Sequence, residues 1–327
     1  MNTQQPAVIC FDLGGSFIKL GMVTSNGELA LLGQENMPTT SWPEFTRLIR
    51  TMIDQHQQHF SASSPVAIST AGIVAPNSGE IFASNIPAFH QRNLARELAD
   101  ELQREVIVHN DADCFAYAEA LAGAGRGHRV VFGAILGSGV GGGLVANGRI
   151  IIGQNGLTGE WGHGPITLTE VEIDGEWRRL PRQFCPCGQR GCLDSYGGAR
   201  GMENLHRTLH NESVSSLDII ARWQRQEALA GQTISAWLQL VSQPLAYCIN
   251  LTGASVVVVG GGLASVSPLI AALDAAVQGY VLRRSAQPLV VPGAFAHHGG
   301  MLGAALLAGE AVSKDISLDP EAGSAPR

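Results

Sequence analysis

The sequence contains no apolar run long enough to cross a membrane, because glycine interrupts its longest hydrophobic stretches well before the roughly 20 residues that a spanning helix needs. The N-terminal residues lack a basic region followed by an apolar stretch and a small-residue cleavage site, so we expect no secretion signal and a cytoplasmic protein. Lysines and arginines form no cluster, and the formal net charge is -7. This balance argues against nucleic acid as the main partner.

Charged residues make up only 15% of the 327 residues and hydrophobic residues 45%, as in a compact globular protein. This length allows two domains with well-buried cores. Glycine is the unusual residue, because the 40 glycines fall in clusters along the chain. Those clusters divide the sequence into two halves of similar design.

Each half opens with strands around a glycine turn and then alternates helices with strands. In the first half we predict strands at 8–11, 18–23, 29–34, 66–70 and 106–109, and helices at 43–59, 94–103 and 112–122. In the second half we predict strands at 129–136, 144–146 and 256–259, a glycine turn at 137–143, and helices at 234–252 and from 268 onward. This order predicts an α/β protein of two related domains, each with a mixed sheet, around a ligand cleft.

The predicted boundary between the lobes lies at the first helix after the strand at 106–109. We assign residues 1–115 to a smaller N-terminal lobe and residues 116–312 to a larger C-terminal lobe, whose final helix can pack back on the first lobe. Residues 313–327 are polar and contain proline, so we expect a disordered tail there.

The glycine turn of the first half is a candidate phosphate-binding site. Gly14 and Gly15 can bring backbone N–H groups close to phosphate, Ser16 supplies a hydroxyl, and Asp12 can hold a hydrated magnesium ion. Taken alone, a glycine turn between strands is more often only a hairpin.

The second half repeats the turn with Gly137, Ser138 and Gly139, and two such turns can close on one polyphosphate from opposite sides. A third glycine cluster, with Gly261 and Gly262, stands at a strand-to-helix junction where a nucleotide's ring or ribose can lie against the backbone. Tight packing explains that cluster equally well. None of the three is a Walker A loop or the start of a dinucleotide-binding unit.

An amide and a carboxylate, Asn110 and Asp111, follow the buried strand at 106–109, at the sheet edge where open α/β folds bind ligands. Asp111 can act as a general base on a sugar hydroxyl that attacks a γ-phosphate. Alternatively, Asn110 or Asp111 only caps the following helix, although Asp113 suits a capping or first-turn role better. Asn85 is a loop residue or a sugar ligand.

Three of the six cysteines, Cys185, Cys187 and Cys192, lie within eight residues, and His163 precedes them. In a cytosolic protein these four side chains predict a zinc site rather than disulfides or three free thiols, because together they supply the four ligands of a tetrahedral metal. Since no position is left open for water, we expect the zinc to be structural. Glu160 lies three residues before His163, where its carboxylate can bind a substrate. The remaining cysteines (Cys10, Cys114 and Cys248) lie in apolar contexts and are expected to be buried.

Over residues 9–308 these motifs together resemble the ROK family of sugar kinases and sugar-responsive repressors, which shares the actin-like and hexokinase-like ATPase fold. The turn from Asp12 to Lys19 resembles the family's Asp-x-Gly-Gly-Thr-x-x-x-Lys motif, with serine for threonine and the lysine displaced by one residue. The segments 110–111, 160–163 and 185–194 resemble its Asn-Asp, Glu-x-Gly-His and cysteine motifs.

The resemblance implies an ATP- and Mg²⁺-dependent sugar kinase that forms a homodimer, with Asp111 as the base on the 6-hydroxyl. It further implies that Glu160 and His163 contact the sugar, and that His163 also binds zinc. Sugar contacts are likewise implied for Gly72, Asn85, Asn110 and Gly139, and ATP contacts for the three glycine clusters and Lys19. The chain departs from the family at Asp194, where a sugar-binding glutamate is usual and aspartate is one methylene shorter.

Within the family, the segments 85–87, 110–116 and 158–163 resemble N-acetylglucosamine kinases, whereas 66–74 and 297–309 resemble N-acetylmannosamine kinases. We expect N-acetylglucosamine as the acceptor, with N-acetylmannosamine or another hexose as the alternative. The first predicted strand begins near Val8, so we expect no winged helix of a ROK repressor. A non-catalytic sugar sensor is the alternative of a different class.

Overall fold

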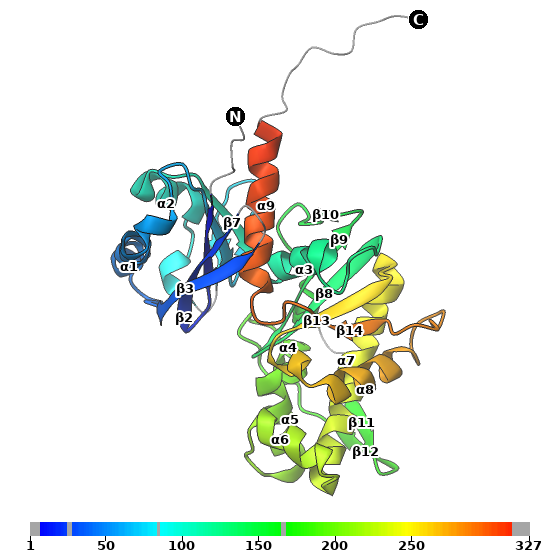
Figure 1. Cartoon of the computed structure of the whole chain (residues 1–327). Coiled ribbons are helices and arrows are strands. Elements are labelled where there is room, and N and C mark those ends of the chain that lie inside the picture. Colours follow the sequence, from blue (N-terminus) through cyan, green and yellow to red (C-terminus); the bar gives the residue numbers. More distant parts are fainter. Residues whose placement is uncertain (1–6, 25–27, 84–85, 165–167, 316–327) are drawn as a thin grey trace, which may run out of the picture.

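Two lobes, each built around a five-stranded mixed sheet, make up this computed structural model, which describes residues 7–24, 28–83, 86–164 and 168–315 (Figure 1). The two sheets share one topology. The order is β3-β2-β1-β4-β7 in the N-terminal lobe and β10-β9-β8-β13-β14 in the C-terminal lobe. In both, the first three strands are antiparallel and the last three are parallel, with the shared strand in the middle. The predicted α/β class with two related halves is confirmed at this level.

The strands of the two sheets overlap the predicted positions, except for β10 and β14, which we did not predict. In the N-terminal lobe they are β1 (Val8–Leu13), β2 (Phe17–Val23), β3 (Leu29–Asn36), β4 (Val66–Thr70) and β7 (Val106–Asn110). In the C-terminal lobe they are β8 (Val130–Leu136), β9 (Val140–Ala146), β10 (Arg149–Ile150), β13 (Val256–Gly260) and β14 (Val290–Pro292). The hairpins β5–β6 (Ile73–Val74, Ile81–Phe82) and β11–β12 (Glu170–Ile173, Glu176–Arg179) extend from the two lobes.

Helices cover both faces of each sheet. The outer face of the first sheet packs on α1 (Trp42–Gln55) and α2 (Leu94–Leu102), and the outer face of the second on α7 (Ala228–Thr252) and α8 (Ser267–Val277). Between the two sheets lie α3 (Asp111–Ala122) and α9 (Gly299–Asp315), which pack against each other; α3 contacts β8 and β9, and α9 contacts β1 and β4. The last helix of the chain therefore returns to the N-terminal lobe (Figure 1).

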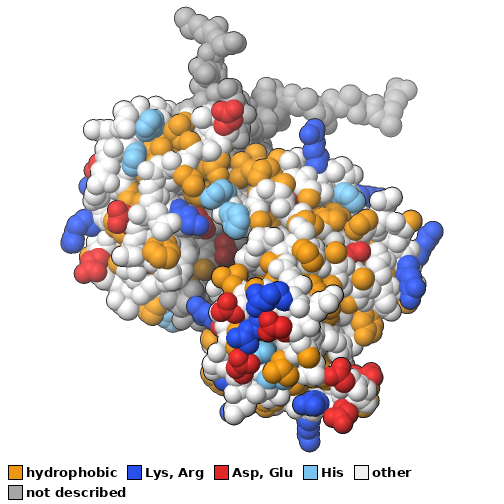
Figure 2. All heavy atoms as spheres, turned by 60° about the horizontal axis from the view of Figure 1, so that its bottom comes forward, with side chains coloured by type: hydrophobic (Ala, Val, Ile, Leu, Met, Phe, Trp, Pro, Cys, Tyr) orange, Lys and Arg blue, Asp and Glu red, His pale blue; other side chains and the backbone are white. Residues whose placement is uncertain are grey.

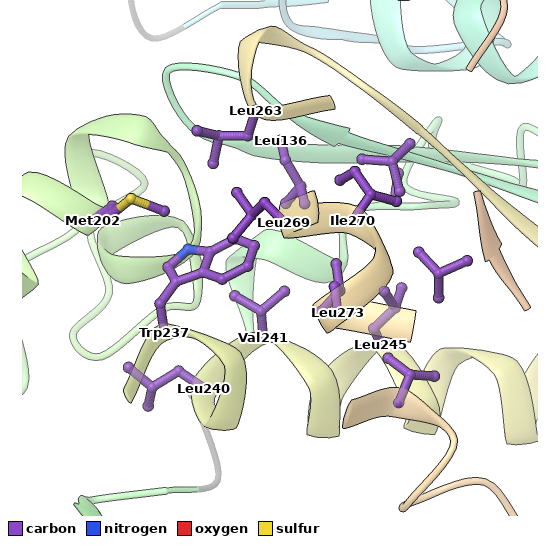
Figure 3. Close-up of a cluster of buried hydrophobic side chains, with 14 of the residues drawn as sticks. Leu136, Met202, Trp237, Leu240, Val241, Leu245, Leu263, Leu269, Ile270 and Leu273 are labelled. Carbon is purple, nitrogen blue, oxygen red and sulfur yellow. The ribbon is translucent and has the colours of Figure 1, made fainter. Parts of the chain in front are cut away.

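Helix α7 forms a large part of the core of the C-terminal lobe. Figure 3 shows Trp237, Val241 and Leu245 of α7 directed toward Leu269 and Leu273 of α8, all of them buried. The Trp237 indole N–H donates to the Gly197 carbonyl at 2.9 Å, so even the polar atom of this side chain is satisfied. The remaining helices α4 (Asp194–Gly197), α5 (Ala199–His210) and α6 (Ser216–Gln224) pack on the same helix, α5 and α6 along its first half.

The structure differs from the sequence expectations at several points. The predicted turn at 137–143 is shorter, because Val140 already begins β9 and Gly141, Gly142 and Gly143 pair with β8. A Cβ on Gly143 would lie 2.8 Å from the Ala112 carbonyl oxygen, so this strand needs glycine for the close approach of α3. We did not predict α4, α5, α6 or the hairpin β11–β12, and α7 begins at 228 rather than 234.

Helix α9 continues to Asp315, three residues into the segment 313–327 for which we predicted disorder. The rest of that segment, and the predicted sugar ligand Asn85, lie outside the described residues. Within the described part of the chain, no helix combines the length and apolar character that a membrane span requires.

Candidate active site

The face drawn in Figure 2 is hollowed between the two lobes, with acidic side chains at the floor of the hollow and basic and histidine side chains at its rim. Three of the predicted site residues, Asp12, Asn110 and Asp111, lie near the end of β1, at the end of β7 and at the start of α3. Because β1, β4 and β7 are parallel neighbours, their ends lie at one edge of the sheet, and Asp12 is close enough to Asp111 for the two charges to interact.

Asp12 is positioned by its two neighbouring strands. Strand register sets Lys19 opposite Asp12 on β2 and Ser69 beside it on β4. The Lys19 ammonium lies 3.8 Å from one carboxylate oxygen, and the Ser69 hydroxyl donates to the other at 3.4 Å. Burial raises the pKa of Asp12, and the Lys19 charge opposes that shift.

The first turn of α9 abuts this carboxylate, which the sequence did not reveal. A Cβ on Gly300 would lie 2.6 Å from the Ser69 hydroxyl and 3.5 Å from the Asp12 carboxylate. Sequence reasoning missed both Ser69 and Gly300, because only strand register and the return of the last helix bring them to Asp12. The pair Gly299-Gly300 was the available signal.

In the first glycine turn, the Gly14 N–H donates to the Phe17 carbonyl at 3.0 Å, so this group closes the hairpin. Gly14 therefore fits the alternative that this glycine turn is a hairpin, because its N–H group is used within the turn. Gly15 and Ser16 are exposed at its tip, where their polar groups can meet a ligand.

The turn between β8 and β9 and the glycine cluster after β13 lie together. A Cβ on Gly261, whose φ is +83°, would lie 2.6 Å from the Gly137 nitrogen. The Gly137 N–H donates to the Gly139 carbonyl at 3.1 Å, and Ser138 is exposed between them. Gly261 therefore serves the close packing of two turns, and Gly262, which has open space around its Cα, lies next to it.

Asn110 caps α3. Its side-chain oxygen accepts from the N–H groups of Ala112 at 2.9 Å and Asp113 at 3.2 Å, and its amide donates to the Gly72 carbonyl at 2.9 Å. The capping role is therefore filled by Asn110, whereas Asp113 lies in the first turn. Gly72 has a φ of +108° and no room for a Cβ, which would lie 2.7 Å from the Phe82 carbonyl oxygen.

Asp111 begins α3 next to that cap, and one of its carboxylate oxygens accepts the Ala112 N–H at 2.9 Å. Burial, the Asp12 charge and, more weakly, the Glu160 charge raise its pKa to about 7. Asp113 is buried, and burial with the charges of Glu160 and Asp111 raises its pKa to about 8. Carboxylates from both lobes thus lie close enough for their charges to interact.

Glu160 and His163 lie on the loop after β10. The Glu160 carboxylate is 3.7 Å from the His163 Nε2 atom, and Trp161 between them donates its indole N–H to the Gly141 carbonyl at 2.7 Å. Burial raises the pKa of Glu160, the His163 ring opposes this, and Asp194 adds to it. The hydrogen bond from the Trp161 indole to Gly141 holds this loop against β9, next to the turn at 137–139.

The other nitrogen of the His163 ring faces the cysteines. Nδ1 lies 3.7 Å from the Cys185 sulfur, and the sulfurs of Cys187 and Cys192 are 3.7 Å apart. One ligand atom from each of these four residues lies within 4.8 Å of the others. Tetrahedral zinc with Zn–S bonds of about 2.3 Å separates its sulfur ligands by about 3.8 Å, so this donor set fits zinc.

Comparison with known proteins identifies a family for this chain. The profile of the ROK family matches residues 8–311. An N-acetyl-D-glucosamine kinase of Yersinia pseudotuberculosis serotype O:3 (strain YPIII) is 31% identical over 297 residues, which cover 91% of this chain and 97% of that protein.

Solved structures share the fold. A ROK hexokinase from Thermus thermophilus superposes with a TM-score of 0.77 at 26% identity, over 94% of this chain and 99% of that one. A ROK family glucokinase from Streptomyces griseus, solved with glucose and AMPPNP, gives a TM-score of 0.76 at 22% identity, over 92% and 98% of the two chains.

Proposed function

This chain belongs to the ROK family, and we propose that it is an ATP-dependent kinase that phosphorylates the 6-hydroxyl of N-acetyl-D-glucosamine. The kinase class is supported by curated relatives that are N-acetyl-D-glucosamine kinases at 31% and 32% identity over most of their length. The observation that carries the proposal is the position of Asp111, a buried carboxylate at the start of α3 that lies close enough to Asp12 and Glu160 for their charges to raise its pKa.

Asp111 is the proposed general base. A base works best when its pKa lies near the operating pH, and the pKa of Asp111 is raised to about 7. As the sugar's 6-oxygen attacks the γ-phosphorus and the bond to the leaving ADP oxygen breaks, the hydroxyl proton passes to Asp111. Asn110 holds the carboxylate in place, because its amide joins the start of α3 to Gly72 on the neighbouring strand end.

ATP is proposed to bind between the turn at 14–16 and the turn at 137–139. Gly15, Ser16 and Ser138 present exposed polar groups from opposite lobes, as phosphate binding requires. The Lys19 ammonium next to Asp12 adds a positive charge on the same side. Asp12 is the proposed partner of hydrated Mg²⁺, which neutralises phosphate charge when bound.

The ribose and base of ATP are proposed to lie over Gly261 and Gly262, because Gly261 packs on Gly137 of the phosphate turn. Glu160 and His163 are the proposed sugar ligands on the other side of that turn, together with the backbone at Gly72 and Gly139. Asn85 remains a sugar ligand proposed from the family resemblance alone.

Zinc is proposed to be held by His163, Cys185, Cys187 and Cys192, which leaves no open position for water. Its role is then structural. Because His163 turns Nδ1 to the cysteines and Nε2 to Glu160, the metal site fixes the ring that is proposed to meet the sugar.

The acceptor is tested with a coupled ADP-release assay over glucose, mannose, N-acetylglucosamine and N-acetylmannosamine. We expect the highest kcat/KM with N-acetylglucosamine. A higher value with another of these sugars would transfer the proposal to that sugar and leave the kinase class intact. Absence of ADP release with all of them, despite sugar binding by calorimetry, would favour the non-catalytic sensor.

A further inference from the structure

One carboxyl oxygen of Asp113, Oδ1, has no hydrogen-bond partner among the described residues, although Asp113 is only 4% exposed. A buried polar atom without a partner is costly, so it points to a contact that forms in the working protein. The proposed catalysis does not use Asp113, and Asn110 already caps α3. The Asp113 carboxyl group is therefore available for another role.

Asp113 does not point in the same direction as Asp111. Two steps along an α-helix turn the side chain by about 200°, so the two residues leave α3 on opposite sides. Strand β9 lies close to the backbone at Asp113, because a Cβ on Gly143 would lie 3.0 Å from the Asp113 Cα atom. The Asp113 side chain thus belongs to the interface of α3 with the C-terminal sheet.

The loop that carries Glu160 lies along the same part of β9. A Cβ on Gly159, whose φ is +87°, would lie 2.8 Å from the Gly143 nitrogen. The Gly143 backbone therefore approaches both Asp113 and the residue before Glu160, which brings the two carboxyl groups near each other. Two charges act on Asp113, and that of Glu160 is stronger than that of Asp111.

No positive group faces Asp113 from the described elements that pack on α3. Strands β4, β8, β9 and β13 carry no charged residue, and neither do the described side chains of α9. Strand β7 contributes His109, and burial lowers the pKa of that ring to about 4, so it is neutral. Arg149 of β10 follows Gly148, which approaches Leu121 at the far end of α3.

A buried carboxyl group with two carboxylate neighbours and no cation is stabilised in its protonated form. The pKa of Asp113, raised to about 8 by burial, Glu160 and Asp111, agrees with this. A protonated carboxyl group donates a hydrogen bond, and a nearby carboxylate is the strongest acceptor for it. Glu160 is the neighbour whose charge acts on Asp113 most.

We propose that Asp113 is a positioning residue for Glu160, whose carboxylate it holds as a neutral hydrogen-bond donor when the sugar binds. This inference rests on the proposed function, because it takes Glu160 as a sugar ligand. The proton stays on Asp113 and is shared with one Glu160 oxygen, and the second Glu160 oxygen remains for a sugar hydroxyl.

A role in helix stability alone fits these observations less well. A carboxylate in the first turn stabilises the start of a helix through its negative charge, and that interaction lowers the pKa of the group. The pKa of Asp113 is raised instead. A helix-stabilising charge would also place no demand on the sugar.

The test compares Asp113→Asn with Asp113→Ala in steady-state kinetics and in calorimetric binding of N-acetyl-D-glucosamine. Asparagine has the same shape and donates a hydrogen bond without ionising, so KM and Kd for the sugar should stay within about threefold of the wild type. Alanine removes the donor and should raise both about tenfold. Because Asp111 is unchanged, kcat should stay within about threefold in both variants.

Asp54→Ala is the matched control, because Asp54 is an exposed aspartate near the end of α1. It should leave KM, Kd and kcat unchanged. An Asp113→Ala variant that binds the sugar as tightly as the wild type overturns the proposal. So does an Asp113→Asn variant that binds it as weakly as Asp113→Ala.

The protonation state of Asp113 is read by NMR of protein labelled with ¹³C in its aspartate carboxyl groups. The signal missing from Asp113→Asn belongs to Asp113, and its shift should change with a midpoint near pH 8. A midpoint below about pH 7 would leave the group ionised at neutral pH and overturn the proposal. This titration does not depend on catalysis, so absence of ADP release would refute the kinase function and leave the protonation of Asp113 tested.

Discussion

Asp194 accepts a hydrogen bond from the Val140 backbone N–H at 2.7 Å and so joins the start of α4 to the turn between β8 and β9. The fit is close, because a Cβ on Gly139 would lie 2.3 Å from the same carboxylate oxygen. The Asp194 carboxylate therefore has a partner at the start of β9, directly after the turn at 137–139. Asp194 can position that turn whether or not its second oxygen reaches the sugar.

Asp194→Ala should raise the KM for ATP about tenfold, because the turn at 137–139 loses a charged hydrogen bond worth about 1.5 kcal/mol or more. Asp194→Asn keeps an oxygen acceptor for Val140 and should stay within about threefold of the wild type. Steady-state kinetics with ATP and sugar varied separately checks this. A KM rise confined to the sugar in both variants would instead make Asp194 a direct sugar ligand.

The pH profile should report Asp111. Because its pKa is raised to about 7 and a base acts only when ionised, kcat/KM for the sugar should rise with pH through about 7 and then level off. Asp100→Asn, an exposed aspartate on α2, should leave the profile unchanged. A profile that is flat from pH 5.5 to 8 would contradict the assignment.

The raised pKa of Asp111 also predicts that the free energy of unfolding falls as pH rises. A carboxyl group whose pKa is raised on folding binds protons more tightly in the folded state, so its penalty appears as pH rises from about 4 to about 7. Without ligands, the wild type should therefore lose stability relative to Asp111→Asn as pH increases over this window. Urea unfolding at pH 5 and pH 8 measures the change, and an equal difference at both values would refute it.

Zinc analysis should give one metal ion per chain for the wild type. Cys185→Ser and Cys192→Ser should lose it and raise the KM for the sugar about tenfold or more, because His163 is no longer held. Cys248→Ser lies outside the cluster and is the control, which should retain full metal. Full metal content in both ligand variants would rule out the proposed set.

The glycines of β9 offer a test of packing. Gly143→Ala should cost about 1–3 kcal/mol in urea unfolding, because the new methyl would meet α3 at the Ala112 carbonyl. Gly231→Ala lies inside α7 with open space around it and should be neutral or stabilising by up to about 1 kcal/mol. Equal effects of the two substitutions would contradict this account of the strand.

The contrast between these two glycines also shows what the sequence could predict. Local patterns were enough for β4, β13 and the helix after Asn110, where hydrophobic runs and polar caps lie within a few residues. Gly143 was assigned to a turn because the sequence does not show how closely α3 approaches it. Only in the folded chain does the Ala112 carbonyl leave no room for a side chain at this position.

Some residues of the candidate site could be predicted from local sequence, and others could not. Asp12, Asn110 and Asp111 lie at strand ends, and a strand followed by polar residues is a local signal. Ser69 and Gly300 reach Asp12 through strand register and through the return of α9, which no local pattern records. The bond from Asp194 to Val140 likewise joins residues that are far apart in the sequence.

The most direct test of the central claim is ADP release by Asp111→Asn with saturating N-acetyl-D-glucosamine and ATP, alongside calorimetric binding of the sugar. Loss of a general base should lower kcat by about 10² to 10⁴-fold, while the Kd for the sugar stays within about threefold. A variant that binds the sugar and keeps near-normal kcat would contradict the assignment of Asp111 as the catalytic base.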